Sequence, residues 1–322
     1  MDNAGNLKPS FYKTKRKIIV QYGWKLIRTI ILVGISYYIL YPIVLKIAVS
    51  LMEKRDLYDI TVLLIPKNFT LDNYVKVFKA MDYGNSFLQT AFVTLITVVS
   101  QLMACALVGY GFARFKFPLK KLLFAMVIFT LIVPPQTIIV PMYLNYSFFD
   151  VFGLIKLITG KTLSLTNTPW TFVVSGLTCM GLKNGMYIFI VRQYFRNVPK
   201  ELEEAALIDG SGAFRTFFSV MLPSARPVLL VIAMFSAVWQ WTDIFYSTWF
   251  MRGSSLLSRK LDSLAMNISQ VESTQGIAVL DPNYTFLLNS TGCILVILPL
   301  IIFFLLAQKQ FVEGIEQSGI VG

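Results

Sequence analysis

The sequence has no histidine among its 322 residues and only three cysteines. Histidine is the commonest general base and the commonest metal ligand, so its absence makes an enzymatic or metal site less expected. Cys105, Cys179 and Cys293 form no CxxC pair and fall within apolar stretches, which predicts neither a metal site nor a disulfide framework. A phosphate-binding GxxxxGK(S/T) loop is also missing from the sequence. We therefore expect a chain that holds no catalytic residue, metal or cofactor of its own.

Charged residues are scarce as well, at 14% of the chain, whereas 56% of the residues are hydrophobic and the mean hydropathy is +0.64. This composition is too apolar for an ordinary soluble domain. A helix needs roughly 20 apolar residues to cross the hydrocarbon core of a membrane. The sequence therefore predicts an all-α polytopic membrane protein with six transmembrane helices, some with polar interruptions, over residues 27–51, 86–112, 122–146, 170–195, 228–250 and 286–308.

Acidic residues are the scarcer of the two charged kinds, with 17 Asp and Glu against 29 Lys and Arg, so the formal net charge is +12. The basic residues gather before the first apolar stretch and in the connections after the second and fourth. The positive-inside rule places these segments, and with six spans both termini, in the cytoplasm. We expect a cytoplasmic arm over 1–26, a transmembrane domain over 27–322 and a short cytoplasmic tail over 309–322. Because the basic residues adjoin spans, they predict contact with membrane lipid and not with nucleic acid.

Two features interrupt the apolar stretches. Pro134, Pro135 and Pro141 lie in or at the end of the third stretch, where a missing backbone N–H bends or breaks a helix. The bent span either lines a pathway or packs with a simple kink. Lys183 falls in the fourth stretch, where an ionisable group usually faces a watery cavity or an acidic partner. Alternatively, this span starts later and Lys183 extends outward to the membrane surface.

The polar connection between the fourth and fifth stretches, residues 196–225, carries the signals of a short surface helix. Pro199 suits a first helical turn, the following acidic residues complement the positive end of the helix dipole, and Gly210 is a typical stop. Helical spacing places four residues on one face, which is small enough for close docking: Leu202, Ala205, Ala206 and Asp209.

The same connection holds a spaced motif. Glu204-Ala205-Ala206 is followed after three residues by Gly210, then after nine by Val220 and after one more by Leu222-Pro223. This pattern resembles the EAA loop of ABC importer permeases, with valine in the place of isoleucine. Without that spacing, the segment would be interpreted as a solvated amphipathic loop.

The resemblance extends over nearly the whole chain, to the carbohydrate-uptake branch and its maltose-permease G-type subunit. It is carried by residues 64–74, 110–114, 192–206 and 307–315. Two places depart from the family pattern. The end of the tail, residues 319–322, lacks the lysine of the usual Gly-Val-Lys-Gly. Residues 241–245 read Trp-Thr-Asp-Ile-Phe where many members have Trp-Asn-Asp-Phe.

The resemblance implies a type I ABC importer permease fold in the bacterial cytoplasmic membrane and a role in saccharide import. It implies three kinds of partner, namely a second permease subunit (an F-type homologue), an ATPase dimer that holds ATP and magnesium, and an extracytoplasmic sugar-binding protein. It also implies that this chain is not an enzyme. The residues implied in coupling to the ATPase are Glu204, Ala205, Ala206, Asp209, Gly210, Leu222 and Pro223.

The fifth stretch offers a candidate surface for the sugar. Trp239, Asp243, Tyr246 and Phe250 are spaced i, i+4, i+7 and i+11, which predicts one helical face with aromatic rings and a carboxylate. With Lys183, the first three of these are our candidate pathway residues. Alternatively, the aromatic residues form an interfacial belt and Asp243 pairs with a basic residue of the partner permease. Which saccharide is carried stays open at this point.

Two other classes of membrane protein fit less well. A secondary transporter would carry ionisable residues in several spans, whereas this chain has mainly Lys183 and Asp243. A membrane enzyme would need a convergent polar cluster, which the sequence does not offer.

Overall fold

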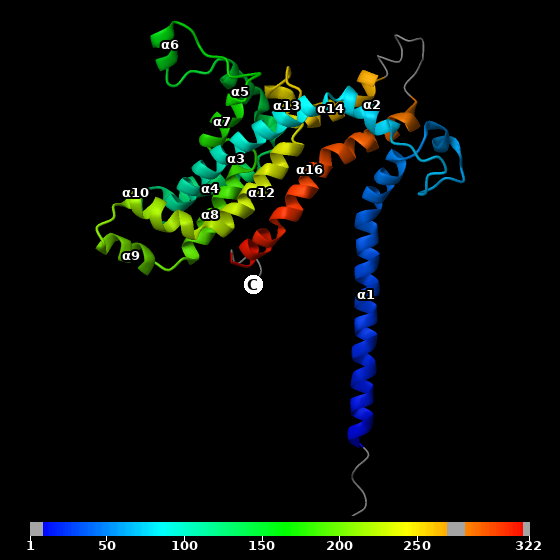
Figure 1. The fold of residues 1–322 in the computed structure, drawn as a ribbon. Coiled ribbons are helices and arrows are strands. Elements are labelled where there is room, and N and C mark those ends of the chain that lie inside the picture. The colour runs from blue at the N-terminus through cyan, green and yellow to red at the C-terminus, as the bar shows by residue number, and fades with distance from the viewer. Residues whose placement is uncertain (1–8, 269–280, 318–322) are drawn as a thin grey trace, which may run out of the picture. The chain divides into compact units, whose positions relative to one another are not determined.

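The computed structural model describes residues 9–268 and 281–317 (Figure 1). Across these residues the chain is helical, and its only extended pairs are two isolated bridges. This confirms the predicted all-α class. The chain forms two compact units, one of Met1–Tyr74 with Asp281–Ile294 and one of Val75–Leu280 with Leu295–Gly322. The predicted domain boundaries at residues 27 and 309 stay predictions.

The first unit contains α1 (Pro9–Ser50), the 3₁₀ turn η1 (Lys54–Tyr58), the start of α2 (Asp72–Ala80) and the start of α16 (Pro282–Gln317). Helix α1 continues unbroken through residue 27, so the expected arm and the first span are one helix. Its last turn is closed from outside the helix. The Asn73 side-chain amide donates to the carbonyls of Ser50 and Met52, at 3.1 and 2.8 Å, and satisfies acceptors that a helix end leaves open.

Helix α3 (Tyr83–Arg114) is the centre of the second unit. It packs against α7 (Trp170–Leu177), α8 (Asn184–Asn197), α12 (Arg226–Thr242) and α14 (Leu257–Asp262) (Figure 1). Its buried residues are mostly small or hydroxyl-bearing, which lets neighbouring helices approach closely. A methyl group on Gly109 would lie 2.6 Å from the Val191 Cγ1 atom. The backbone of α3 at Gly109 therefore packs directly against the Val191 side chain of α8.

Three of the six predicted spans are broken in the structure. The third consists of α4 (Lys120–Ile132) and α5 (Pro135–Ser147), which meet at 106° beside Pro134, so the predicted proline break is confirmed. The fourth is divided into α7 and α8 by a six-residue break that includes left-handed residues at Cys179 and Lys183. The fifth ends with α12 at Thr242 and resumes as α13 (Phe245–Phe250). Single helices over 170–195 and 228–250 were therefore wrong predictions.

The remaining predicted spans are long helices. Three helices are long and apolar enough to cross a membrane, namely Gln21–Ser50 of α1, Tyr83–Arg114 (α3) and Pro282–Lys309 of α16. If each of two bent helix pairs counts as one span, the described residues hold at most five. One of those pairs is α4 with α5. The other joins the short helices of Ala213–Ser224, which are α10 (Ala213–Thr216), the π-helix η2 (Phe217–Met221) and α11 (Leu222–Ser224), to α12. Six spans therefore stay a prediction.

A buried polar cluster holds the break between α7 and α8 in place. The Gln101 side-chain amide of α3 donates to the Leu182 carbonyl at 3.0 Å and to Asn184 Oδ1 at 2.6 Å. The Asn184 amide donates to the Gly176 carbonyl at 3.0 Å, and the Ser236 hydroxyl of α12 donates to Gln101 Oε1. Unpaired backbone groups cost several kcal/mol in hydrocarbon, so a broken span needs such partners. Four helices, α3, α7, α8 and α12, thus share one set of hydrogen bonds.

The close contact of Gly176 with α3 generates a stability prediction. A methyl group on Gly176 would overlap Ser100 Oγ and lie 3.3 Å from the Gln101 backbone nitrogen. We expect Gly176→Ala to destabilise the purified complex by about 1–3 kcal/mol through overpacking, measured as a lower thermal midpoint. Adding Ser100→Ala removes the shortest contact and should recover part of the loss. Gly111→Ala is the control, because its nearest neighbour lies 3.9 Å away. Equal midpoints for Gly176→Ala and Gly111→Ala would contradict this packing.

Candidate functional site

The predicted surface helix between the fourth and fifth stretches is present as α9 (Glu201–Ile208). Three glutamates lie in its first turn, where negative charge complements the helix dipole. Its end is a Schellman turn, in which Gly210 N–H donates to the Leu207 carbonyl and Ser211 N–H to the Ala206 carbonyl, both at 3.0 Å. Gly210 has a φ of 81°, a conformation that glycine adopts without strain. The predicted helix and its glycine stop are confirmed.

Helix α9 is attached to α3 through one charged pair. Arg114 Nε lies 3.1 Å from Glu203 Oε2, and the two side chains are only 8% and 14% exposed. The Arg114 guanidinium also donates to the Val198 carbonyl at 2.7 Å, in the segment that leads into α9. A guanidinium that forms an ion pair with a carboxylate and donates a hydrogen bond to a carbonyl holds both groups in place. The start of α9 is thereby held to the end of α3.

The expected docking face of α9 is divided between two surroundings. Ala206 lies one turn after Glu203 and is 7% exposed, because it packs against its own chain. Leu202, Ala205 and Asp209 remain exposed. The expectation that both alanines present one open face is therefore wrong for Ala206, which faces the same way as the anchoring glutamate.

The outward side of the loop carries large apolar side chains. Ile208 is 86% exposed and Phe214 of α10 is 78% exposed. Leu202 and Leu207 are exposed as well. Glu204 is exposed beside them. We call Leu202, Leu207, Ile208 and Phe214 the apolar rim. Exposed apolar side chains gathered on one short loop mark an interaction surface.

The second half of the loop, from α10 to α11, enters the hydrophobic core of the unit. Phe217 and Met221 of η2 are buried, and the ring of Phe217 lies 4.9 Å from that of Tyr110 on α3. The Tyr110 ring also lies 5.3 Å from Phe195 of α8. The Tyr194 hydroxyl of α8 donates to the Ser224 carbonyl at 2.5 Å. The loop is thus packed against α3 and α8 at one end and continuous with α12 at the other.

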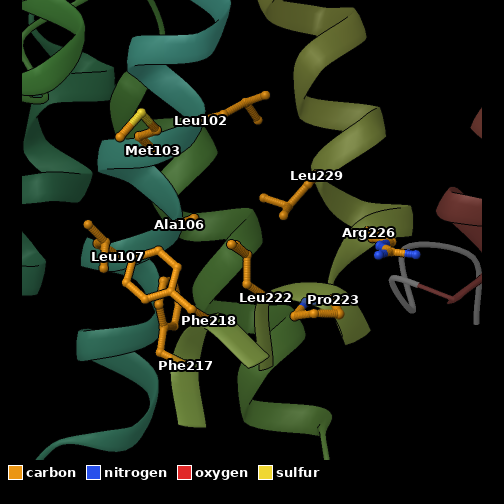
Figure 2. A pocket seen from close by; sticks show the side chains of 10 residues that line it. All are labelled: Leu102, Met103, Ala106, Leu107, Phe217, Phe218, Leu222, Pro223, Arg226 and Leu229. Atoms are coloured by element: carbon orange, nitrogen blue, oxygen red, sulfur yellow. The ribbon is translucent and has the colours of Figure 1, made fainter. Parts of the chain in front are cut away.

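Leu222 and Pro223 follow η2 as the first residues of α11, a position in which proline is tolerated because its missing N–H is not needed. Both side chains line an apolar pocket beside α3 (Figure 2). The structure therefore places the two ends of the predicted coupling motif differently. Glu204, Ala205 and Gly210 are on the outer side of the loop, whereas Leu222 and Pro223 lie where the loop meets the helices.

A second candidate site lies where the broken helices meet. A cavity of about 120 Å³ is lined by residues from the α4–α5 break, the α7–α8 break and α13. Lys183 and Tyr246, both predicted pathway residues, line it. The Lys183 ammonium lies 4.8 Å from the ring centre of Trp239, a cation–π contact between two exposed side chains. Lys183 itself precedes α8 with a φ of 63°, so it belongs to the break and not to a helix interior.

Asp243 and Tyr246 occupy places that the sequence did not predict. Because α12 ends at Thr242, the expected single face through Trp239, Asp243, Tyr246 and Phe250 is wrong. The Asp243 carboxylate accepts hydrogen bonds from the N–H groups of Tyr246 and Ser247, at 3.2 and 2.7 Å, and from the Ser247 hydroxyl at 2.8 Å. It caps the first turn of α13, the ordinary role of an aspartate at a helix start. Tyr246 is buried and stacks on Phe250 at 5.9 Å.

Sequence reasoning missed Gln101, Asn184 and Ser236, the polar cluster that connects α3 and α12 to the break beside the cavity. The available signal was the presence of two side-chain amides inside predicted apolar spans, since polar groups there require partners. Their partners are carbonyls exposed by a break that the sequence did not predict. The cluster therefore could not be assembled from spacing alone.

The unit combines a cavity between broken helices with a surface helix, α9, that is held to α3. Both are features of a membrane transport component. Residues 101–317 match the family described as binding-protein-dependent transport system inner membrane component, and the chain belongs to this family. Proteins of this family are transport subunits and not enzymes.

Two relatives match almost the full chain. The arabinooligosaccharides transport system permease protein AraQ of Halalkalibacterium halodurans is 26% identical over 311 residues, which is 96% of this chain and 100% of the relative. The maltodextrin transport system permease protein MalD of Streptococcus pneumoniae is 27% identical over 290 residues, 89% of this chain and 92% of the relative. The predicted resemblance to carbohydrate-uptake permeases is confirmed.

A solved structure shares the fold. It is a bacterial ABC transporter involved in the import of the acidic polysaccharide alginate, and one of its chains matches with a TM-score of 0.67. At 19% identity, the match covers 91% of this chain and 98% of that one. The predicted ABC importer permease fold is thereby confirmed.

The Arg114–Glu203 pair generates a prediction about the loop. Glu203→Gln leaves a mostly buried guanidinium without its counter-charge, at a cost of roughly 1–3 kcal/mol. In the purified complex, we expect amide hydrogen exchange of residues 201–208 to accelerate by roughly tenfold. Glu201→Gln, which removes an exposed carboxylate in the same turn, is the control and should leave the exchange unchanged. If both variants exchange alike, the pair does not hold α9.

Proposed function

We propose that this chain is a multi-pass permease subunit of the bacterial cytoplasmic membrane, and that it carries a saccharide as part of an ATP-driven importer. The observation that carries the proposal is α9, a glycine-terminated helix anchored to α3 and open on its outer side, in the place where the family resemblance puts the ATPase-coupling loop. Relatives named for arabinooligosaccharides and maltodextrin support an oligosaccharide as the cargo.

The apolar rim and Glu204 form the surface that we assign to the ATPase. A short helix with large apolar side chains and one outward carboxylate suits a groove with an apolar floor and a donor-rich wall. Ala205 lets the helix lie close to that groove, and Gly210 reverses the chain after it. Asp209 is exposed at the end of α9 and belongs to the same surface. The ATPase dimer holds ATP and magnesium, and this chain contributes no cofactor site.

Movement of the loop reaches the membrane part through rigid contacts. The Glu203–Arg114 pair acts on the end of α3, and Phe217 acts on the same helix through Tyr110. Thirteen residues earlier on α3, about 20 Å along the helix, Gln101 holds the break beside the cavity. A displacement of α9 that moves α3 thereby moves the walls of the cavity. Leu222 and Pro223 connect the same loop to α12.

For the cargo, we assign the surface of Lys183 and Trp239 in place of a face through Asp243. An aromatic ring stacks on the apolar face of a sugar and an ammonium donates to its hydroxyls, whereas the Asp243 carboxylate is occupied by α13. Tyr246 lines the cavity as well. Ordinary ligand sites enclose about 300–1,000 Å³, so a 120 Å³ cavity is one wall of a larger site. The second permease, an F-type homologue, supplies the other wall, and an extracytoplasmic binding protein delivers the sugar.

Gly210 provides the test of coupling. Gly210→Ala places a side chain at a φ of 81° in open space, so it strains the turn by about 1–2 kcal/mol without a steric clash. We expect reduced sugar uptake and reduced co-purification of the ATPase, with the permease pair still assembled. Gly212→Ala is a matched control two residues on, with a φ of −70° and no neighbour within 4 Å. Wild-type uptake and ATPase recovery in Gly210→Ala would reject the assignment of the loop.

The cargo surface has its own test. Trp239→Ala and Lys183→Gln should each lower binding-protein-dependent uptake of an oligosaccharide by roughly fivefold or more while the complex assembles normally, since one stacking or polar contact contributes about 1 kcal/mol. Trp170→Ala is the control, at an exposed tryptophan for which the described residues show no contact with Lys183. If Trp239 instead anchors the subunit at the membrane interface, its replacement will lower the amount of assembled complex and leave the uptake per assembled complex unchanged.

A further inference from the structure

An apolar pocket of about 380 Å³ lies between α3, the second half of the loop and the start of α12 (Figure 2). Nine of its ten lining residues are apolar, and the tenth is Arg226. Met103 and Leu107 come from α3, Phe218 and Leu222 come from the loop, and Leu229 projects from α12. The pocket is separate from the cavity at Lys183 and shares no residue with it.

Arg226 is the first residue of α12 and is exposed. Among the residues that the structure describes, it has neither an ion pair nor a hydrogen bond. A cation at the N-terminal end of a helix gains nothing from the helix dipole, which favours anions there. Within the described part of the chain, the guanidinium is therefore a positive group without a partner beside an apolar pocket, and its complement is a molecule with one anionic group and a long apolar part.

The size of the pocket suits a small apolar ligand. At about 380 Å³, it lies within the roughly 300–1,000 Å³ of ordinary small-molecule sites, so it can accept a lipid chain. Three lining side chains, Met103, Leu107 and Phe218, are also among the exposed apolar residues, so the pocket is open to the surroundings of the protein.

We propose that this pocket binds an anionic phospholipid of the cytoplasmic leaflet, with an acyl chain between α3 and α12 and its phosphate at Arg226. The distribution of basic residues places this end of the spans at the cytoplasmic side. The cytoplasmic leaflet is the negatively charged one, and basic pockets between membrane helices bind acidic head groups there. The bound chain lies against Phe218 and Leu222, so the lipid supports the loop that we assign to coupling.

Photolabelling of the complete importer in nanodiscs tests the proposal. Phosphatidylglycerol and phosphatidylcholine analogues with the same diazirine-bearing acyl chain are compared, and labelled peptides are mapped by mass spectrometry. We expect phosphatidylglycerol to label the α3 and α12 peptides roughly fivefold more, since one basic residue near the surface contributes about that factor. Arg226→Gln should reduce this labelling to the phosphatidylcholine level, whereas the control Lys116→Gln, at an exposed lysine outside the pocket, should leave it unchanged.

A second variant keeps the proposal testable if Arg226→Gln does not assemble. Met103→Trp fills the pocket and should abolish labelling by both lipids, so persistent labelling at α3 and α12 would overturn the site. Equal labelling by the two lipids in the natural protein would overturn the role of Arg226. A photoreactive amino acid at Leu107 that joins the second permease and no lipid would assign the pocket to a protein partner. Labelling needs no transport, so its failure and a failure of the transport function are separate results.

Discussion

Backbone N–H and C=O groups that leave a helix inside a membrane have no water to bind, and the second unit is organised around this constraint. Three of its predicted spans are broken, and each break has an identifiable solution. The α4–α5 break uses prolines, whose missing N–H removes a donor that would need a partner. The α7–α8 break is satisfied by Gln101 and Asn184. The α12–α13 break is satisfied by the carboxylate of Asp243.

Because Gln101 belongs to α3, the same helix connects the two candidate sites. One end of α3 carries Arg114, which holds α9, and its middle carries the amide that holds the α7–α8 break. The small and hydroxyl-bearing face between them lets α8 and α12 pack closely enough to move with it. A short loop can therefore influence a cavity about 20 Å away without a flexible connection. Conversely, the occupied cavity can bias the position of α9, since coupling between two sites is reciprocal.

The parts of this arrangement that the sequence predicts are those with a local cause. Apolar length predicts the long helices, Pro134 predicts the bend of the third span, and Gly210 predicts the end of α9, because each depends on the chemistry of one residue or one stretch. The breaks at 178–183 and 243–244 contain no proline, so apolar length alone favoured continuous helices there. The first break depends on the Gln101 side chain of α3, which only the assembled fold brings into range. The second is capped locally by Asp243, a signal that apolar length does not contain.

The spacing of the motif identifies the loop, but only the structure shows which motif residues are exposed and which are buried. Helical periodicity places Ala205 and Ala206 on one small face, but adjacent positions differ by about 100° around a helix, and the fold uses that angle. Glu203 pairs with Arg114 of α3 and Ala206 is buried, which leaves Ala205 and the apolar rim outward. A coupling element needs both sides, because a helix that only docks would move without moving the spans, and a helix that only anchors would receive no force. The division of the motif between the two sides therefore fits the coupling role that we propose for the loop.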